Sequence, residues 1–354
     1  TLNYRLQTAA EKAVSDGLKS LQKRMLENGV AAPDPQAALI ATSVREGQIL
    51  AMVGGKDFAN SPFNRATAAL RQPGSAFKPF VFGCAIDNGF SRSMLILDSP
   101  VAYPGSEKGE QWQPQNFSRG YEGEITLRRA LAVSQNIPAV RLTEKLGPQA
   151  VIAFSRRLGI TAPLTSDLSL ALGSSEVRLI ELVNAYAIFA NRGQRISLTA
   201  ITEIVDRNGR IVWQPDRSRQ MAIPPASAAI VTNMLTAAVN EGTGLAATVI
   251  NRPLAGKTGT TNKTRDALFI GYSPSISAGV WVGQESGASL GKGETGAKAA
   301  LPIWINFMQT ALDQTAVDNF DIPETVVIKS IDPVKGTLLD PDHPDAVTAL
   351  FKKN

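Results

Sequence analysis

Segments with the pattern of β-strands lie near both ends of the chain, and helical segments fill the middle. In the N-terminal part, two apolar runs flank the turn residues Arg45-Glu46-Gly47-Gln48 and predict a hairpin. Three further apolar runs with short connections follow in the C-terminal half. The predicted strands are Ala38–Val44, Ile49–Val53, Leu254–Thr261, Ala267–Tyr272 and Ser277–Val282. This order predicts an α+β fold with an antiparallel sheet.

Glycines, prolines and capping residues divide the remaining chain into helices and connections. The predicted helices are 1–28, Ser75–Asn88, 126–132, 138–147, 148–159, Val177–Asn191, Pro225–Val239 and Pro302–Leu312. The other predicted segments are a long ordered loop over 98–123, a hairpin over 196–213 that turns at Asp206-Arg207-Asn208-Gly209, and a strand at Thr325–Ile331 followed by a tail. We expect three parts: an N-terminal helix and linker (1–36), a main domain (37–312), and a C-terminal strand and tail (313–354).

The composition favours a folded chain and argues against several classes of protein. Of the 354 residues, 44% are hydrophobic and 19% are charged, which rules out long disorder. The net charge of +5 is small for this length and no block of five like charges occurs, so we do not expect nucleic-acid binding. The sequence contains no run of 18 apolar residues, so we expect no segment of it to span a bilayer. Because the chain starts at Thr1 without a signal-peptide pattern, we expect it to be a fragment of a longer protein.

The chain has one histidine and one cysteine, which restricts its possible chemistry. Cys84 cannot form an intramolecular disulfide or a cysteine-based metal site, and we expect it to be packed in the core. His343 lies in Asp340-Pro341-Asp342-His343-Pro344-Asp345, which is typical of a solvated turn. No metal site and no cofactor are expected. An enzyme of this composition must use lysine, carboxylates or hydroxyls as acids and bases.

Two glycine-containing motifs fail on their context. Gly256-Lys257-Thr258 resembles the end of a phosphate-binding loop, but Asn251 stands where that loop needs a glycine. The run Gly291-Lys292-Gly293-Glu294-Thr295-Gly296 matches a dinucleotide-binding pattern, but no acidic residue closes a following strand at the required distance. We interpret this run as a glycine-rich loop beside a site.

Three short motifs occur in an order that points to catalysis. Ser75-Ala76-Phe77-Lys78 opens a predicted helix, so that Lys78 can reach the Ser75 hydroxyl from one turn away. Two other Ser-x-x-Lys tetrads, at Ser20 and Ser289, lack this context. Ser134-Gln135-Asn136 follows between two helices, and Lys257-Thr258-Gly259-Thr260 follows on a strand. Each of the last two motifs occurs once, and chance assembly of all three is improbable.

Together these motifs resemble those of the penicillin-binding transpeptidases, in the penicilloyl-serine family that includes serine β-lactamases. Flanking segments are similar to those of the bifunctional class A group. They are Arg71-Gln72-Pro73-Gly74, Gly123-Glu124-Ile125-Thr126-Leu127, Leu254–Asn262, Arg265-Asp266-Ala267, Thr295-Gly296 and Ala300-Leu301-Pro302-Ile303-Trp304. The resemblance implies a five-stranded antiparallel sheet flanked by helices, with an all-helical subdomain. It also implies a membrane anchor and a glycosyltransferase domain upstream in the full-length protein.

The resemblance assigns a role to each motif residue. Ser75 would be the nucleophile, Lys78 its base, and Ser134 a proton relay to the leaving nitrogen, with Lys257 as a second cation that lowers the pKa of Lys78. The substrate-binding residues would be Asn136, Thr258, Gly259 and Thr260, with Lys257 and Thr260 on the terminal carboxylate. The backbone N–H groups of Ser75 and Thr260 would form the oxyanion hole.

The implied function is DD-transpeptidation of D-Ala-D-Ala stem peptides on lipid II-derived glycan strands, at the extracytoplasmic face of a bacterial membrane. β-Lactam antibiotics would acylate Ser75, and other cell-wall synthesis proteins could be partners. Two alternatives stay open: a DD-carboxypeptidase or β-lactamase-type hydrolase, and a non-catalytic β-lactam sensor. A hydrolase needs a carboxylate that activates water; Glu181-Leu182-Val183-Asn184 is one residue short of the class A β-lactamase pattern. By helical periodicity, Glu181 should face solvent.

Overall fold

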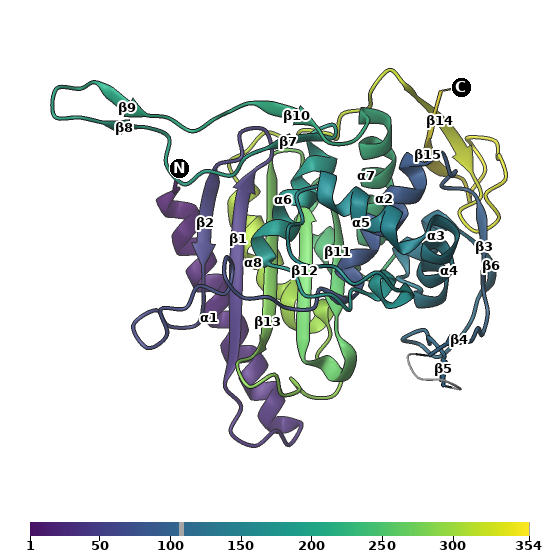
Figure 1. Ribbon diagram of the computed structural model, residues 1–354, viewed down its shortest axis with the longest axis horizontal. Helices are drawn as coiled ribbons and strands as arrows, with labels where there is room; N and C mark the ends of the chain where they lie inside the picture. The colour runs from purple at the N-terminus through teal and green to yellow at the C-terminus, as the bar shows by residue number, and fades with distance from the viewer. Residues whose placement is uncertain (106–109, 354) are drawn as a thin grey trace.

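A five-stranded sheet is the centre of the fold, and its strands come from both ends of the sequence (Figure 1). The computed structural model describes residues 1–105 and 110–353. The strand order is β11-β12-β13-β1-β2, and every neighbouring pair is antiparallel. The bounds are β11 Ala255–Thr260, β12 Asp266–Tyr272, β13 Ile276–Gln284, β1 Pro35–Ser43 and β2 Ile49–Val53. This confirms the predicted fold class.

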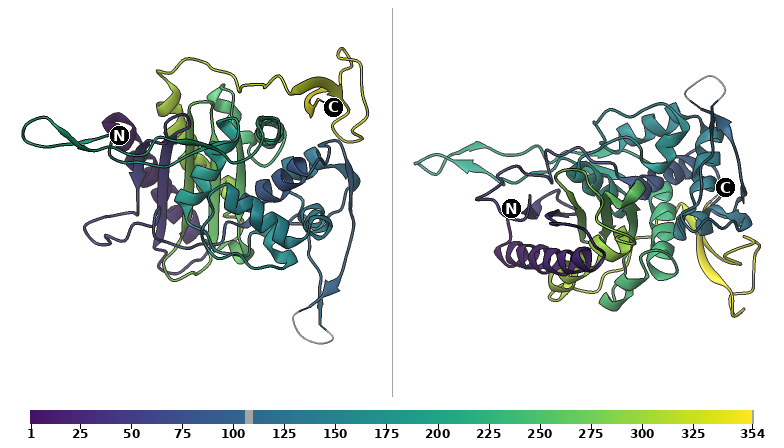
Figure 2. Two further views of the ribbon diagram at one scale, coloured as in Figure 1. Left: turned by 45° about the horizontal axis from the view of Figure 1, so that its top comes forward. Right: turned by 90° about the horizontal axis from the view of Figure 1, so that it is seen from below.

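Helices cover both faces of the sheet because both faces are apolar. Along β1, Ala38 and Ile40 join the core on one side, whereas Ala37, Leu39 and Ala41 join the core on the other, as the alternation of a strand requires. Helices α1 and α8 pack on the second side and α6 on the first (Figures 1 and 2). Their bounds are α1 Tyr4–Glu27, α6 Leu179–Ala190 and α8 Leu301–Leu312.

The remaining helices form a second layer beside strand β11. They are α2 Lys78–Asp87, α3 Leu127–Ala132, α4 Asn136–Leu146, α5 Pro148–Arg157 and α7 Pro225–Asn240. Helix α7 contacts both β11 and α2 and so joins this layer to the sheet. The α3 helix begins as predicted, because the Thr126 side chain caps it by accepting a hydrogen bond from the Arg129 N–H.

Short two-stranded pairs surround these layers. They are β3 Leu95–Asp98 with β6 Gly123–Thr126, β4 Tyr103–Pro104 with β5 Gln111–Trp112, β7 Gln194–Ile196 with β10 Arg219–Met221, β8 Ile204–Val205 with β9 Ile211–Trp213, and β14 Val326–Ile331 with β15 Val347–Lys352. Pair β8–β9 projects from the body of the molecule (Figure 1). Within residues 1–105 and 110–353, no helix has the length and apolar character of a membrane span.

Four sequence predictions need correction. The hairpin over 196–213 is limited to β8 and β9, because β7 pairs with β10 instead. The segment after Ile331 is not only a tail, since it contains β15. The loop over 98–123 contains the pair β4–β5 and ends where β6 begins, and its residues 106–109 lie outside the described residues. The helix predicted from Ser75 begins as a 3₁₀ turn over Gly74–Phe77, and its α-helical part starts at Lys78. The division at residues 36 and 312 stays a prediction.

The single cysteine and the single histidine lie where the sequence predicts. Cys84 of α2 is 1% exposed in the core, and burial raises the pKa of its thiol to about 11. His343 is exposed in a turn, where the Ala346 N–H donates to its carbonyl oxygen.

The buried stripe of α1 predicts how the fold depends on this helix. Leu21 is 0% exposed, whereas Leu26 on the same helix is 57% exposed. We expect Leu21→Ala to lower the free energy of unfolding by about 2–5 kcal/mol through the cavity that it leaves. Leu26→Ala should change it by about 0.5 kcal/mol or less. Urea denaturation of both variants measures the difference, and equal losses would contradict the packing of α1 as a layer of the core.

Candidate active site

The three motifs meet at one groove between the sheet edge and the helical layer. The groove has a volume of about 1090 Å³. Five of the eight predicted site residues line it: Ser75, Ser134, Asn136, Thr258 and Thr260. The Lys78 and Lys257 side chains are completely buried, and both reach the Ser134 hydroxyl. The structure therefore brings residues from three distant parts of the chain together.

Ser75 lies in the 3₁₀ turn that precedes α2, with its side chain on the groove. The turn is held from the sheet side by Tyr186 of α6, whose hydroxyl donates to the Ala76 carbonyl oxygen at 2.7 Å. Tyr186 is fully buried, so this hydrogen bond is protected from water. The fixed turn presents the Ser75 hydroxyl to the groove while the following residue packs into the core.

The Lys78 ammonium group has a different partner from the one expected. Its Nζ donates to the Ser134 carbonyl oxygen at 2.5 Å and to Asn136 Oδ1 at 2.6 Å, and it lies 3.3 Å from Ser134 Oγ. Among the described residues, no hydrogen bond joins Lys78 to the Ser75 side chain. The Lys78 side chain points toward the N-terminus of α4, because Ser134 and Asn136 offer two strong acceptors there.

Lys257 approaches the same hydroxyl from strand β11. Its Nζ lies 2.8 Å from Ser134 Oγ and 3.3 Å from Thr258 Oγ1. Thr243, which follows α7, bonds to Thr258 Oγ1 at 2.7 Å and also lies 3.5 Å from the Lys257 ammonium group. Ser134 Oγ is thus placed between two lysine side chains.

Burial changes the protonation of both lysines. Burial lowers the pKa of Lys257 to about 7. Burial is also the main cause that lowers the pKa of Lys78 well below its ordinary value, and the nearby Lys257 charge lowers it further. The Asp98 carboxylate acts in the opposite direction and favours the charged Lys78. A neutral lysine at this position has a free electron pair and can accept a proton.

Ser134 has an unusual backbone conformation, with φ at +65°. A serine in the left-handed region is uncommon, and such conformations are concentrated at functional sites. Neighbouring contacts hold it: Asn116 Oδ1 accepts the Asn136 N–H at 2.8 Å, and Asn116 Nδ2 donates to the buried Asp98 carboxylate at 2.7 Å. The Asn136 side chain is fixed as well, since its Nδ2 donates to the Gln115 carbonyl oxygen at 2.7 Å.

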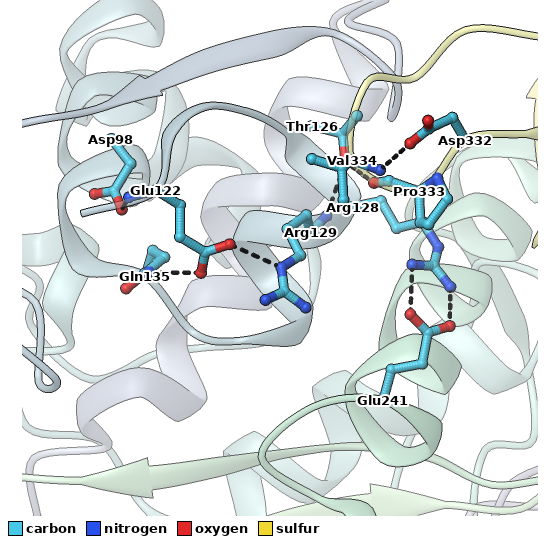
Figure 3. A network of polar contacts seen from close by, with 10 residues as sticks. All are labelled: Asp98, Glu122, Thr126, Arg128, Arg129, Gln135, Glu241, Asp332, Pro333 and Val334. Atoms are coloured by element: carbon cyan, nitrogen blue, oxygen red, sulfur yellow. Dashed lines mark hydrogen bonds and ion pairs between the residues drawn. The ribbon is translucent and has the colours of Figure 1, made fainter. Parts of the chain in front are cut away.

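Glu122 forms hydrogen bonds that hold the segment between α3 and α4, in which Ser134 lies (Figure 3). One oxygen accepts from Gln135 Nε2 at 3.0 Å and the other from Arg129 Nε at 3.0 Å. The Glu122 N–H itself donates to Asp98 at 2.9 Å. Figure 3 shows these contacts beside the ion pair of Arg128 with Glu241, which joins α3 to the end of α7.

The close contact of β11 with the Ser75 turn requires a glycine. A Cβ atom on Gly259 would lie 2.3 Å from the Pro73 carbonyl oxygen and 3.1 Å from Ala76 Cβ. No other residue could occupy this position without moving the serine away from the strand. The site therefore requires glycine at position 259. The adjacent residues Thr258 and Thr260 both line the groove.

Sequence reasoning missed several residues that build this site. Thr243, Asn116, Glu122 and Tyr186 each contact a motif residue or its backbone, yet none belongs to a recognisable motif. The only available signal was that Asn116 and Glu122 lie in a polar loop without a predicted element. Glu181 was wrongly expected to face solvent: its side chain is 10% exposed and accepts hydrogen bonds from Thr161. It does not line the groove.

The described residues contain no group of three or more His, Cys, Asp or Glu side chains that could hold a metal ion. The groove itself offers hydroxyls, amides and lysines. This donor set suits hydrogen bonding to an anionic organic ligand and proton transfer through lysine and serine.

Comparison with known proteins identifies the family of this chain. The family model described as "Penicillin binding protein transpeptidase domain" matches residues 37–300. Penicillin-binding protein 1A of Aquifex aeolicus is 39% identical over 321 residues, which are 91% of this chain and 44% of that protein. Penicillin-binding protein 1A of Neisseria gonorrhoeae is 37% identical over 300 residues, 82% of this chain and 38% of that protein. The chain thus spans less than half the length of these curated relatives.

Solved structures of penicillin-binding proteins have a fold similar to that of this chain. Penicillin-binding protein 1A from Haemophilus influenzae has a TM-score of 0.84 and 28% identity, over 91% of this chain and 54% of that chain. PonA1 from Mycobacterium tuberculosis in complex with penicillin V has a TM-score of 0.79 and 27% identity, over 97% of this chain and 90% of that chain. The chain belongs to the penicillin-binding protein transpeptidase family, in the class A group that its motifs resemble.

Proposed function

We propose that this chain is a serine DD-transpeptidase that cross-links D-Ala-D-Ala stem peptides of peptidoglycan through an acyl-enzyme on Ser75. One observation carries the proposal: two buried lysines flank the Ser134 hydroxyl, directly beneath the groove that Ser75 faces. The arrangement supplies an acid and a base without histidine. A penicillin complex of the related PonA1 supports the expectation that β-lactams enter the same groove.

Lys78 activates Ser75 when it is neutral. A neutral amine has two N–H bonds and one electron pair, and the two close acceptors of Lys78, the Ser134 carbonyl oxygen and Asn136 Oδ1, use both N–H bonds. The electron pair remains to take the Ser75 proton as Oγ attacks the carbonyl carbon of the penultimate D-Ala. The lowered pKa of Lys78 increases the share of its neutral form at any given pH.

Ser134 then transfers a proton to the leaving group. As the C–N bond breaks, the Ser134 hydroxyl donates its proton to the departing D-Ala nitrogen and regains one from the neighbouring lysines, which lie 2.8 Å and 3.3 Å from its oxygen. The acyl group next passes to an amine of a neighbouring stem peptide, which releases its own proton by the same route. Ser75 is regenerated and one cross-link is formed.

The strand edge binds the rest of the substrate. Lys257 and Thr260 hold the terminal carboxylate, Asn136 bonds to the peptide amide, and Thr258 and Gly259 complete the strand against which the peptide lies. The backbone N–H groups of Ser75 and Thr260 stabilise the oxyanion, each contributing about 10²–10³ in rate. We place the activity at the extracytoplasmic face of a bacterial membrane, in a longer protein that carries an anchor and a glycosyltransferase domain and works with other cell-wall synthesis proteins.

Hydrolysis is the main alternative, and the groove offers little support for it. Of the described residues that line the groove, Glu122 alone carries a carboxylate, and both of its oxygens already accept hydrogen bonds from Gln135 and Arg129. Glu181 bonds to Thr161 and lies outside the groove lining. No carboxylate among these residues is free to activate a water for deacylation. A silent sensor is also disfavoured, because the Ser134 hydroxyl contacts both lysines that are proposed for proton transfer.

The first test of this function is acylation of Ser75. Ser75→Ala should abolish labelling by a fluorescent penicillin and should keep the fold, because the side chain lies on the groove surface. Intact-protein mass and peptide mapping after labelling locate the adduct. Ser20→Ala and Ser289→Ala serve as controls from the other two Ser-x-x-Lys tetrads and should label normally. An adduct on either of these serines would refute the assignment.

A second test uses the pH dependence of acylation. Because Lys78 acts in its neutral form, the acylation rate should rise with pH as Lys78 loses its proton. Removal of the second cation with Lys257→Met takes away a cause that lowers the pKa of Lys78, so the rising limb should move to higher pH. Stopped-flow labelling with a fluorescent penicillin between pH 5 and 10 measures the limb. Lys263→Met, which removes an exposed lysine from the same groove, is the control and should leave it in place. If the acylation rate of Lys257→Met rises over the same pH range as that of the wild type, Lys257 does not lower the pKa of Lys78 as proposed.

A third test follows the lifetime of the acyl-enzyme. Since no groove carboxylate is free to activate water, the penicilloyl adduct should persist for many minutes or longer. The measurement is intact-protein mass against time after excess antibiotic is removed. Fast return of the unmodified mass, with steady hydrolysis of the antibiotic, would instead assign the chain to the hydrolases.

A further inference from the structure

The segment from Gly293 to Ala297 forms part of one wall of the groove, and its residues alternate between two directions. Gly293, Thr295 and Ala297 line the groove. Glu294 and Gly296, which lie between them, are buried and make their contacts elsewhere. These two residues hold the wall in place: Glu294 bonds to helix α1, and Gly296 bonds to strand β11.

Glu294 anchors the wall to the N-terminal helix. Its carboxylate is 0% exposed and accepts hydrogen bonds from Arg24 of α1, with Nε at 3.0 Å and Nη2 at 2.9 Å from its two oxygens. Lys298 provides a second cation at 3.0 Å. Burial disfavours the ionised Glu294, but the hydrogen bonds from Arg24 and Lys298 outweigh it and hold its pKa below the ordinary value. Arg24 also donates to the Lys298 carbonyl oxygen at 3.3 Å, so it binds both ends of this turn.

Gly296 joins the wall to strand β11. Its N–H donates to Thr260 Oγ1 at 2.9 Å. A Cβ atom on Gly296 would lie 2.3 Å from the Leu268 carbonyl oxygen and 2.4 Å from that of Gly259, so the two backbones are in direct contact. The Gly296 N–H uses one electron pair of Thr260 Oγ1. The Thr260 hydroxyl proton has no acceptor among the described residues and can therefore donate into the groove.

We propose that Arg24 is a positioning residue for the carboxylate-binding group of the groove: through Glu294 it holds Gly296 against Thr260 and so orients the Thr260 hydroxyl toward a ligand carboxylate. The inference rests on the proposed function, in which Thr260 contacts the terminal carboxylate of the substrate. It makes α1, which lies outside the matched family segment, a determinant of ligand recognition.

The buried charge explains why a distant arginine has this effect. Without Arg24, the Glu294 carboxylate keeps only Lys298, a lysine whose side chain is about half exposed. A buried carboxylate with insufficient partners moves toward water, and the turn that carries it moves with it. Because Gly296 is two residues away, its contact with Thr260 is lost first.

The experiment compares a β-lactam that has a free carboxylate with its methyl ester. The ratio of their acylation rate constants measures recognition of the carboxylate separately from the reactivity of Ser75. Arg24→Met should lower the ratio about tenfold, the factor expected for one charge-assisted hydrogen bond. Arg5→Met is the matched control and should leave the ratio unchanged. Arg5 lies on the same helix, and within the described part of the chain its side chain donates to the Thr310 carbonyl oxygen of α8 and not to Glu294.

A double-mutant cycle identifies Thr260 as the group through which Arg24 acts. Thr260→Val alone should lower the ratio, and Arg24→Met added to Thr260→Val should lower it no further. If Arg24→Met does not fold, Arg24→Lys keeps one charge without the two-point contact and should give an intermediate ratio. A ratio that is unchanged in Arg24→Met, or that falls equally in Arg5→Met, would overturn the inference. Absence of any adduct on Ser75 in the wild-type chain would overturn the proposed function itself.

Discussion

The contact of two buried lysines with one serine hydroxyl is the constraint around which the site is arranged. Lys78 starts α2, Ser134 precedes α4, and Lys257 lies on β11, so the helical layer must dock against the edge of the sheet for the three to meet. Buried ammonium groups are costly unless acceptors surround them. The Ser134 carbonyl oxygen and the Asn136 side chain supply those acceptors, and the remaining cost is expressed as lowered pKa values. The same burial that weakens the fold locally favours the neutral form of both lysines, which can accept a proton.

Direct backbone contact maintains this arrangement. At Gly259 the strand meets the turn that carries Ser75, and at Gly296 the following wall meets the strand. No side chain separates the two backbones at either glycine. The distance between the backbones is therefore set by the contact of their peptide units, whose dimensions vary little. The groove therefore has a fixed floor, while the side chains that decide protonation lie just below it.

Much of the site could be predicted because each motif lies at the boundary of an element whose start or end is encoded locally. The helix starts, the strand of the third motif and the antiparallel sheet depend on short-range patterns. The partner of Lys78 could not be predicted in this way, because it depends on acceptors in a loop from another part of the chain. The left-handed conformation of Ser134 and the burial of Glu181 under Thr161 have no local signal either. The same is true of Arg24 and Glu294, since nothing in either segment marks the other as its partner.

The groove combines this fixed floor with an open rim. On the floor, any side chain at Gly259 or Gly296 would collide with backbone atoms, so these two positions require glycine. On the rim, Phe117, Lys263 and Lys292 line the same groove but are exposed to solvent. Their replacement alters the shape and charge that an incoming molecule meets without disturbing the buried lysines. Substitutions at the rim can therefore change which molecules the groove admits, while the buried lysines below it keep their surroundings.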